Sequence, residues 1–143
     1  DEAVDGFRKR FPDHLFREYL AIEFYRQKES SQKMVEAVDR IIQRVKDPYL
    51  KLLKLEPLIN LGEFELTQAI VDEFKANFQW SRVIGLHELA LTVAEKDFGR
   101  SVEVLRKLKP LLGVRLENEL KLPRYAELLK SRNYKEWKSV SED

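Results

Sequence analysis

A three-residue break between apolar segments recurs along the chain at intervals of 34 residues. GEF at 62–64 matches KDF at 96–98, and KES at 28–30 falls at the same phase one interval earlier. A repeat of this length is typical of chains built from similar helical units, which stack because no single unit can bury its apolar face. The break at 62–64 is therefore expected to be the inner turn of a helical hairpin.

The segments around these breaks carry apolar residues at three- and four-residue steps, the spacing of an amphipathic helix. We expect helices near 15–25, 34–45, 49–61, 66–78, 83–93 and 102–112. The residues that correspond before two breaks are Leu52, Leu55 and Ile59, matched by Leu86, Leu89 and Val93. After the breaks, Thr67, Val71 and Phe74 match Ser101, Leu105 and Leu108. In the first hairpin this second match needs a one-residue shift, to Met34, Val38 and Ile41. No window alternates with period two over the length of a strand, so an all-α fold is predicted.

Residues with strong preferences for helix ends mark the expected boundaries. Ser30, Ser81 and Asp97 precede apolar runs and are predicted N-caps. Asp47-Pro48 predicts a boundary, because the residue before a proline disfavours the α region. Gly113 is expected to end the last of the six helices, since glycine readily takes the left-handed conformation that follows many helices.

The ends of the chain fit the same scheme. Residues 1–12 predict the second helix of a truncated earlier repeat, and complete hairpins are expected at 14–47, 48–80 and 81–113. Residues 114–143 are expected to form capping helices and a tail, because the last unit of a stack needs a cover with a polar outer side.

The capping segment carries helix signals of its own. Pro123 suits the first turn of a helix, where its missing N–H is no loss. The side chains expected to pack on the last hairpin are Tyr125, Leu128, Leu129, Tyr134 and Trp137. Phe78 and Trp80, at a junction between hairpins, are interpreted as packing between repeats. Whether residues 122–143 instead fill a binding groove is left open.

A helix–turn–helix period of 34 residues resembles the tetratricopeptide repeat (TPR). The residues of the third hairpin that carry this resemblance are Leu86, Leu89, Ala90, Val93, Asp97, Phe98, Ser101 and Leu105. The turn at 62–64 matches as well, whereas Glu18, Glu56 and Pro57 depart from the family pattern. The resemblance covers about residues 1–112. It implies a right-handed α–α superhelix, a solenoid of stacked hairpins.

In that family the first helix of each hairpin lines a concave groove, whose usual guest is a peptide or a helix of a partner. Carried over to this chain, the groove residues are Phe16, Tyr19, Glu23, Arg26, Leu53, Lys54, Asn60, His87, Leu91 and Glu95. The alternative is that these side chains face solvent or pack internally. The stretch FREYLAIEF at 16–24 also resembles the half-a-TPR repeats of RNA-processing factors.

Composition limits the chemistry. The chain has no cysteine, which excludes thiolate metal sites, disulfides and cysteine nucleophiles. His14 and His87 are far apart, and neither has a metal-binding partner four residues away, so no metal, cofactor or catalytic residue is predicted. A net charge of +1 makes a nucleic-acid partner unexpected. No apolar run approaches the ~20 residues that cross a bilayer, so no membrane partner is expected.

These observations predict a non-catalytic protein–protein interaction scaffold that binds a peptide or helix of a partner. The alternatives are an accessory, regulatory or oligomerisation domain of a larger protein, enzymatic or not, and an RNA-processing scaffold. Self-association is also open, because Ala3, Phe7 and Phe11 would expose an apolar face. Since Asp1 begins in mid-pattern, we expect part of a longer protein or a processed product. We expect the protein to be soluble and favour the cytoplasm.

Overall fold

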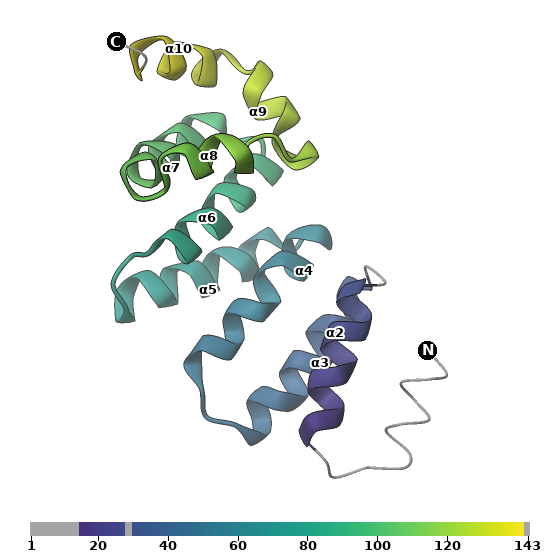
Figure 1. Ribbon diagram of the computed structural model, residues 1–143. Helices are drawn as coiled ribbons and strands as arrows, with labels where there is room; N and C mark the ends of the chain where they lie inside the picture. Colours follow the sequence, from purple (N-terminus) through teal and green to yellow (C-terminus); the bar gives the residue numbers. More distant parts are fainter. Residues whose placement is uncertain (1–14, 28–29, 142–143) are drawn as a thin grey trace. The chain divides into compact units, whose positions relative to one another are not determined.

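The fold is all-helical throughout the part of the chain that can be described. The computed structural model describes residues 15–27 and 30–141 (Figure 1). Within these ranges the chain forms helices and turns, with no strand, which confirms the all-α prediction. The chain divides into two compact units, Asp1–Glu63 and Phe64–Asp143. The predicted helix at 1–12 lies outside the described residues.

In the first unit, a helical hairpin and a third helical segment enclose an apolar core. Its elements are α2 (Leu15–Gln27), α3 (Ser31–Arg44), the 3₁₀ segment η1 (Pro48–Lys54) and α4 (Leu55–Asn60). α3 lies at the centre, in contact with α2, η1 and α4. The buried core residues are Ala21, Ile22, Tyr25, Met34, Ala37, Val38, Ile41 and Leu50. Met34, Val38 and Ile41 are among them, so the shifted register expected for α3 is confirmed.

The helix predicted at 49–61 is divided, and Pro57 supplies the reason. A proline has no N–H to donate to the carbonyl four residues earlier, and its ring clashes with that carbonyl. The affected carbonyl belongs to Leu53, and the backbone up to Lys54 is accordingly 3₁₀ before α4 begins at Leu55. Asp47 caps the start of η1, where its Oδ1 accepts the backbone N–H of Tyr49 at 3.0 Å.

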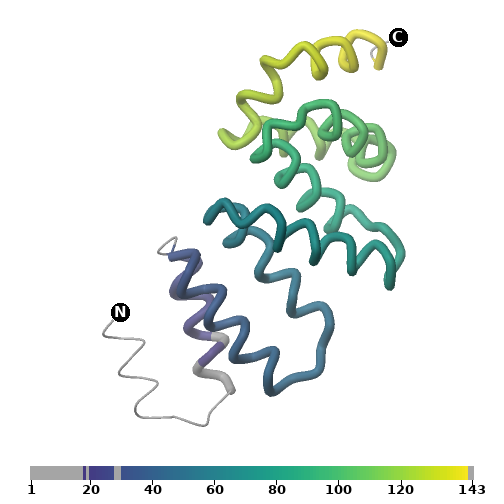
Figure 2. The backbone as a smooth tube through the Cα atoms, turned by 180° about the vertical axis from the view of Figure 1, so that it is seen from behind, coloured from purple at the N-terminus to yellow at the C-terminus, as the bar shows by residue number. Residues whose placement is uncertain are grey.

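The second unit is built on the hairpin of α6 and α7 (Figure 2). Its elements are α5 (Phe64–Asn77), α6 (Arg82–Ala94), α7 (Phe98–Leu112), α8 (Val114–Glu119), η2 (Pro123–Tyr125), α9 (Ala126–Lys130) and α10 (Arg132–Ser141). α5 packs on α6, and α10 packs on α7. Near the turn that joins α6 and α7, the buried hydroxyls of Thr92 and Ser101 lie 2.9 Å apart. Small side chains at this crossing let the two helices pack tightly.

The C-terminal segment completes the core of the second unit. Its buried residues Leu116, Leu120, Tyr125 and Leu128 share one cluster with Leu89, Val93, Val104, Leu105 and Leu108 of the hairpin. Leu129, Tyr134 and Trp137 pack against the same cluster while staying partly exposed. The predicted packing of this segment on the last hairpin is thereby confirmed. α10 has no buried residue, so its outer side is solvated, as expected of a cover.

Most of the predicted helix ends are confirmed. The side chains of Ser81 and Asp97 accept backbone N–H groups of the first turns of α6 and α7, at 3.5 and 3.3 Å. Ser30 does occupy the N-cap position of α3, but its side chain makes no capping hydrogen bond. Gly113 ends α7 with a φ of 53°, a conformation that glycine adopts without strain.

The turns before α3, α5 and α7 share one backbone hydrogen bond, which recurs at nearly the same interval. A backbone N–H donates to the carbonyl five residues earlier, in the bonds Ser30 to Tyr25 (3.0 Å), Glu63 to Leu58 (2.9 Å) and Asp97 to Thr92 (2.9 Å). This is the long bond of the Schellman motif, which needs a left-handed residue after the helix. Gly62 and Lys96 supply it, with φ of 75° and 60°. The recurrence found in the sequence is thus also a recurrence of backbone geometry.

Candidate functional site

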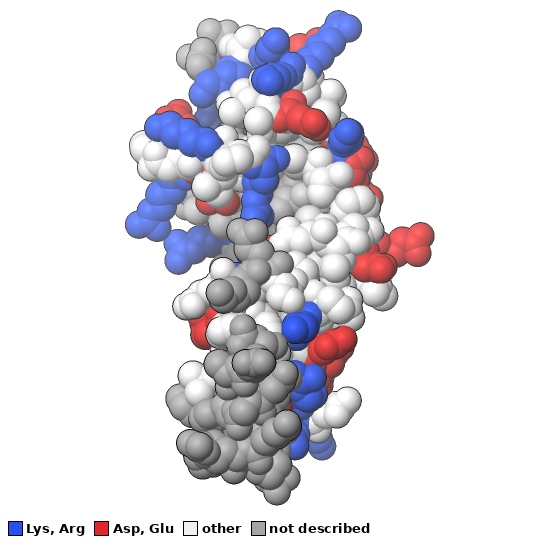
Figure 3. All heavy atoms as spheres, turned by 90° about the vertical axis from the view of Figure 1, so that its right-hand side faces the viewer, with Lys and Arg blue, Asp and Glu red and all other residues white. Residues whose placement is uncertain are grey.

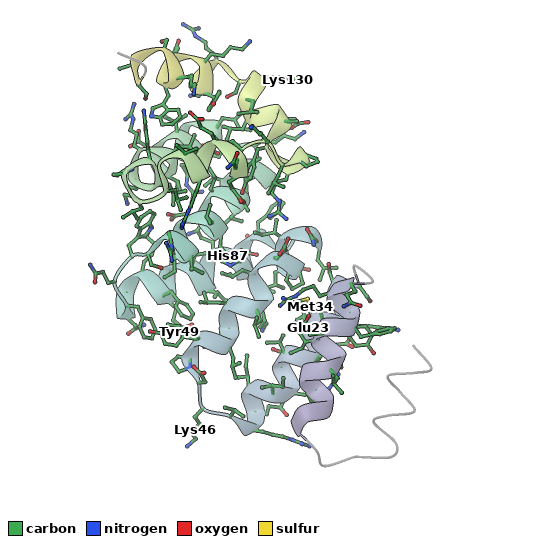
Figure 4. The ribbon with its side chains drawn as sticks, viewed as in Figure 1. Glu23, Met34, Lys46, Tyr49, His87 and Lys130 are labelled. Carbon is green, nitrogen blue, oxygen red and sulfur yellow. The ribbon has the colours of Figure 1, made fainter. Side chains whose placement is uncertain are left out.

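The predicted groove residues of the first unit differ in exposure. Glu23 and Arg26 are exposed on α2 and pair with each other at 3.5 Å (Figure 4). Leu53 is half-buried against the core, and Lys54 Nζ lies 2.8 Å from Asp39 Oδ1. Asn60 is exposed at the end of α4. The side chains of Phe16 and Tyr19, the other two groove residues predicted on α2, lie outside what the structure describes.

In the second unit the predicted groove residues all belong to α6 or its C-terminal turn. His87, labelled in Figure 4, is half-buried, and Glu95 is exposed and lies 3.7 Å from Arg100. Leu91 is fully buried. A fully buried side chain has no surface to offer a ligand, so Leu91 serves packing instead. The groove formed by the remaining residues stays a prediction, because they are divided between the two units.

A polar cleft of about 250 Å³ lies among α5, α6 and α7. It is lined by Gln68, Asp72, Lys75, Glu88, Thr92, Arg100, Glu103, Val104 and Lys107. Its hydrogen bonds join α5 to the hairpin: Arg100 Nη2 donates to Gln68 Oε1 at 2.8 Å, and Gln68 Nε2 donates to Asp72 Oδ1 at 2.9 Å. Because these charges and amides already satisfy one another, the cleft positions α5 on the hairpin and leaves little capacity for a ligand.

Glu88 is the most buried charge in that cleft, with a side chain 7% exposed. Its carboxylate accepts hydrogen bonds from Lys75 Nζ at 2.9 Å and from Trp80 Nε1 at 3.4 Å. The indole reaches it because Gly85 has no side chain: a Cβ there would come within 2.5 Å of the Trp80 ring. Trp80 therefore packs within the second unit, and Gly85 is what admits it.

Glu18 in the first unit is a second buried carboxylate on a helix face. Its side chain is 1% exposed, and its Oε2 accepts a hydrogen bond from Arg40 Nε at 2.8 Å. Glu18 stands where the family pattern has a large apolar residue. The ion pair with α3 explains how the core tolerates the departure, because a buried charge is stable only when it is paired.

A larger cleft, about 580 Å³, lies between α7 and α10. We name it the α7–α10 cleft; its walls are Gly99, Val102, Glu103 and Arg106 of α7, and Asn133, Glu136, Trp137, Val140 and Ser141 of α10. Both sets follow helical spacing, so each helix presents one face. Its volume falls within the ~300–1,000 Å³ of typical ligand sites.

The two helices beside the α7–α10 cleft run in the same direction and are fastened at one end. Gly99 lies opposite Asn133, and Lys109 Nζ donates to the Ser141 carbonyl at 3.1 Å. The same ammonium group sits 5.6 Å from the centre of the Trp137 ring. Val140 is 74% exposed, which leaves part of the apolar wall open. An apolar wall with charged residues at its rim suits the side chains of an amphipathic segment.

Tyr125 is a titratable group in the core of the second unit. Burial raises the pKa of Tyr125, whose hydroxyl donates to Glu119 Oε1 at 3.4 Å inside the core. Among the residues that the structure describes, no group of His, Asp or Glu is arranged to hold a metal ion, and no helix is long and apolar enough to cross a membrane. The chain matches no family model, no curated protein and no solved structure.

Proposed function

We propose that this chain is a non-catalytic interaction scaffold of TPR-like helical hairpins, which holds a helix or an extended segment of a partner protein. The observation that carries the proposal is the repeated inner turn. The bonds to Tyr25, Leu58 and Thr92 are followed by second helices that begin at Ser31, Phe64 and Phe98, at steps of 33 and 34 residues. A turn bond that recurs three times at this interval favours a repeat protein, and such proteins usually present an extended binding surface.

Buried ion pairs between helices favour a rigid binding surface. The pairs Glu18–Arg40 and Lys75–Glu88 each join two helices through a carboxylate that is almost fully buried. Such pairs favour one register of helix packing, because any other register would leave a charge buried without its partner. A surface fixed before the partner arrives lowers the entropic cost of binding.

The α7–α10 cleft is the binding place that the described side chains support best. It combines sufficient volume, a partly exposed aromatic and the open side chain of Val140. Polar pairs stand at its rim: Arg106 with Glu103 at 2.8 Å, and Arg132 with Glu136 at 2.7 Å. The predicted groove along the first helices, including Glu23 and Arg26, is the second candidate place.

Two exposed aliphatic side chains allow a matched test. Val140 in the cleft is 74% exposed, and Leu66 on α5, outside the cleft, is 54% exposed. Neither Val140→Glu nor Leu66→Glu should disturb the core. Peptides that bind the full chain would be selected from a random library displayed on phage, and the enriched peptide titrated against each variant by fluorescence anisotropy.

We expect the selection to converge on a peptide with apolar residues at regular spacing. Val140→Glu should weaken its binding about tenfold, because a carboxylate replaces an apolar contact in the cleft. Leu66→Glu should change the affinity less than about twofold. Equal affinities for both variants would move the site away from the cleft, and a selection without enrichment from folded protein would contradict the scaffold proposal.

A further inference from the structure

Charge is unevenly distributed along the second unit. Residues 104–138 contain ten Lys or Arg and four Asp or Glu, whereas residues 64–103 contain four Lys or Arg and seven Asp or Glu. The net charge of the whole chain is only +1, so it does not reveal this asymmetry. Figure 3 shows Lys and Arg side chains gathered over the upper part of the molecule, where the C-terminal elements lie. A local excess of one sign attracts partners of the other.

Exposed aliphatic side chains accompany the positive charge at the junction of α7 and α8. Leu111 is 53% exposed, Val114 75% and Leu122 43%. Arg115 and Lys121 stand beside them, and both are exposed. We name this surface the α7–α8 patch; its residues are Leu111, Val114, Arg115, Lys121 and Leu122.

The geometry of α8 explains why these side chains point outward together. Leu116 and Leu120, four residues apart, turn one face of the helix into the core. Val114 lies on the opposite face, at the start of α8. The helix ends at Glu119, and a turn follows in which the Lys121 N–H donates to the Asn118 carbonyl at 3.2 Å. Lys121 and Leu122 are exposed in this turn. Gly113 sets the corner between α7 and α8 with its φ of 53°.

The cations of the patch remain available to a partner. No ion pair joins Arg115 or Lys121 to another residue in the part of the chain that the structure describes. Glu117, an exposed acid of α8, is paired elsewhere, at 3.8 Å from Lys138 of α10. A carboxylate brought by a partner would therefore meet positive charge without displacing an internal contact.

We propose that the α7–α8 patch binds an acidic amphipathic segment of a partner protein, with aliphatic side chains against Leu111 and Val114 and carboxylates against Arg115 and Lys121. The patch follows α8 for about 10 Å, which corresponds to about two turns of a partner helix. The apolar contact supplies affinity, and the opposite charges supply orientation and a faster approach.

A protein segment fits this surface better than RNA or a membrane. Single-stranded RNA is usually held by exposed aromatic rings that stack on its bases. Tyr125 is buried, and Tyr134 and Trp137 pack against the core. A membrane-surface helix needs a long apolar face, whereas α8 has six residues and exposes one aliphatic side chain.

Anisotropy of a fluorescein-labelled peptide tests the inference on the full chain. The probe is a peptide of about four helical turns, with Glu and Leu at amphipathic spacing. Its neutral counterpart has Gln at every Glu position. The test variants are Arg115→Glu and Lys121→Glu. The matched controls are Lys130→Glu and Lys135→Glu, which reverse exposed cations outside the patch that also have no ion pair in the described chain.

The acidic peptide should bind at least about tenfold more tightly than the neutral one, and added salt should weaken its binding. Each patch variant should lower the affinity about tenfold, and each control less than about twofold. Equal loss in patch and control variants would overturn the proposal, because the attraction would then be diffuse. Tighter binding of polyuridylate, or of vesicles containing phosphatidylserine, would overturn it in favour of RNA or membrane.

The result is independent of the test of the α7–α10 cleft. A peptide from the phage selection that is sensitive to Val140→Glu would uphold the proposed function even if the acidic peptide fails. An acidic peptide that binds but responds to Val140→Glu, and not to Lys121→Glu, would place it in the cleft and overturn the assignment to the patch.

Discussion

At the scale of single residues, the inner turns show how one backbone geometry is served by different side chains. Gly62 and Lys96 occupy equivalent positions, yet only Gly62 takes positive φ without a steric cost. The sequence offset predicts the turn at both positions. It does not predict that a lysine would adopt the left-handed conformation, because that follows from the hydrogen bonds and packing on either side of it.

Lys96→Gly should therefore stabilise the protein by about 0.5–1 kcal/mol, and Gly62→Ala should destabilise it by about 1 kcal/mol. No atom lies within 4 Å of a Cβ added at Gly62, so that cost is conformational and not steric. Urea denaturation followed by circular dichroism measures both effects. Changes of the same sign in the two variants would contradict the shared turn geometry.

Tyr125 makes stability depend on alkaline pH. Burial raises its pKa above the value of about 10 found in unfolded chains. Below pH ~10 the hydroxyl is protonated in both states, so its contribution is fully present. Above that pH the unfolded state releases the proton first, and stability should fall by about 1.4 kcal/mol per pH unit from this group.

Tyr125→Phe removes that proton while keeping the ring in the core. Its stability should match the parent near neutral pH and decline less steeply between about pH 10 and 11, because the other titrating groups are unchanged. Urea denaturation at several pH values compares the two slopes. Parallel slopes would mean that the tyrosine ionises equally easily in the folded and unfolded protein.

At the scale of helices, apolar periodicity and cap residues predict most of the helices. They do not predict the ion pairs and hydrogen bonds that connect one helix to another. Glu18 was recognised as a departure from an apolar position, but its partner Arg40 lies 22 residues away. The Lys75–Glu88 pair and the α7–α10 cleft likewise depend on how helices pack. A single sequence carries no signal for such contacts, because many exposed charges would satisfy the same pattern.

The Glu18–Arg40 pair gives a prediction at this scale. Arg40→Met removes a charged hydrogen-bond donor from a buried carboxylate and should cost about 2–4 kcal/mol, since Arg40 itself is partly exposed. The control Arg106→Met removes an exposed pair, with side chains 59% and 67% exposed, and should cost less than about 0.5 kcal/mol. Thermal unfolding compares the stability losses of the two variants. Equal losses would show that burial of Glu18 does not increase the contribution of its ion pair to stability.

At the scale of the molecule, the division at Glu63 falls inside the hairpin predicted at 48–80. η1 and α4 belong to the first unit and α5 to the second. The repeat in the sequence follows local turns and helix faces, which recur across that boundary. It does not report where contacts between helices are dense, so it does not predict the two units. The spacing of Tyr125, Leu128 and Leu129 does predict packing on the last hairpin, and these residues belong to or pack against its core.

The central claim is that preformed helical hairpins hold a partner segment on their surface. The most direct measurement is an amide chemical-shift map of the isotope-labelled full chain, recorded with and without the peptide enriched in the phage selection. Shifts should be concentrated in α7 and α10 around the cleft, with the amides of the inner turns unchanged. Saturating peptide that leaves α7 and α10 unperturbed, or that shifts amides throughout both units, would contradict it.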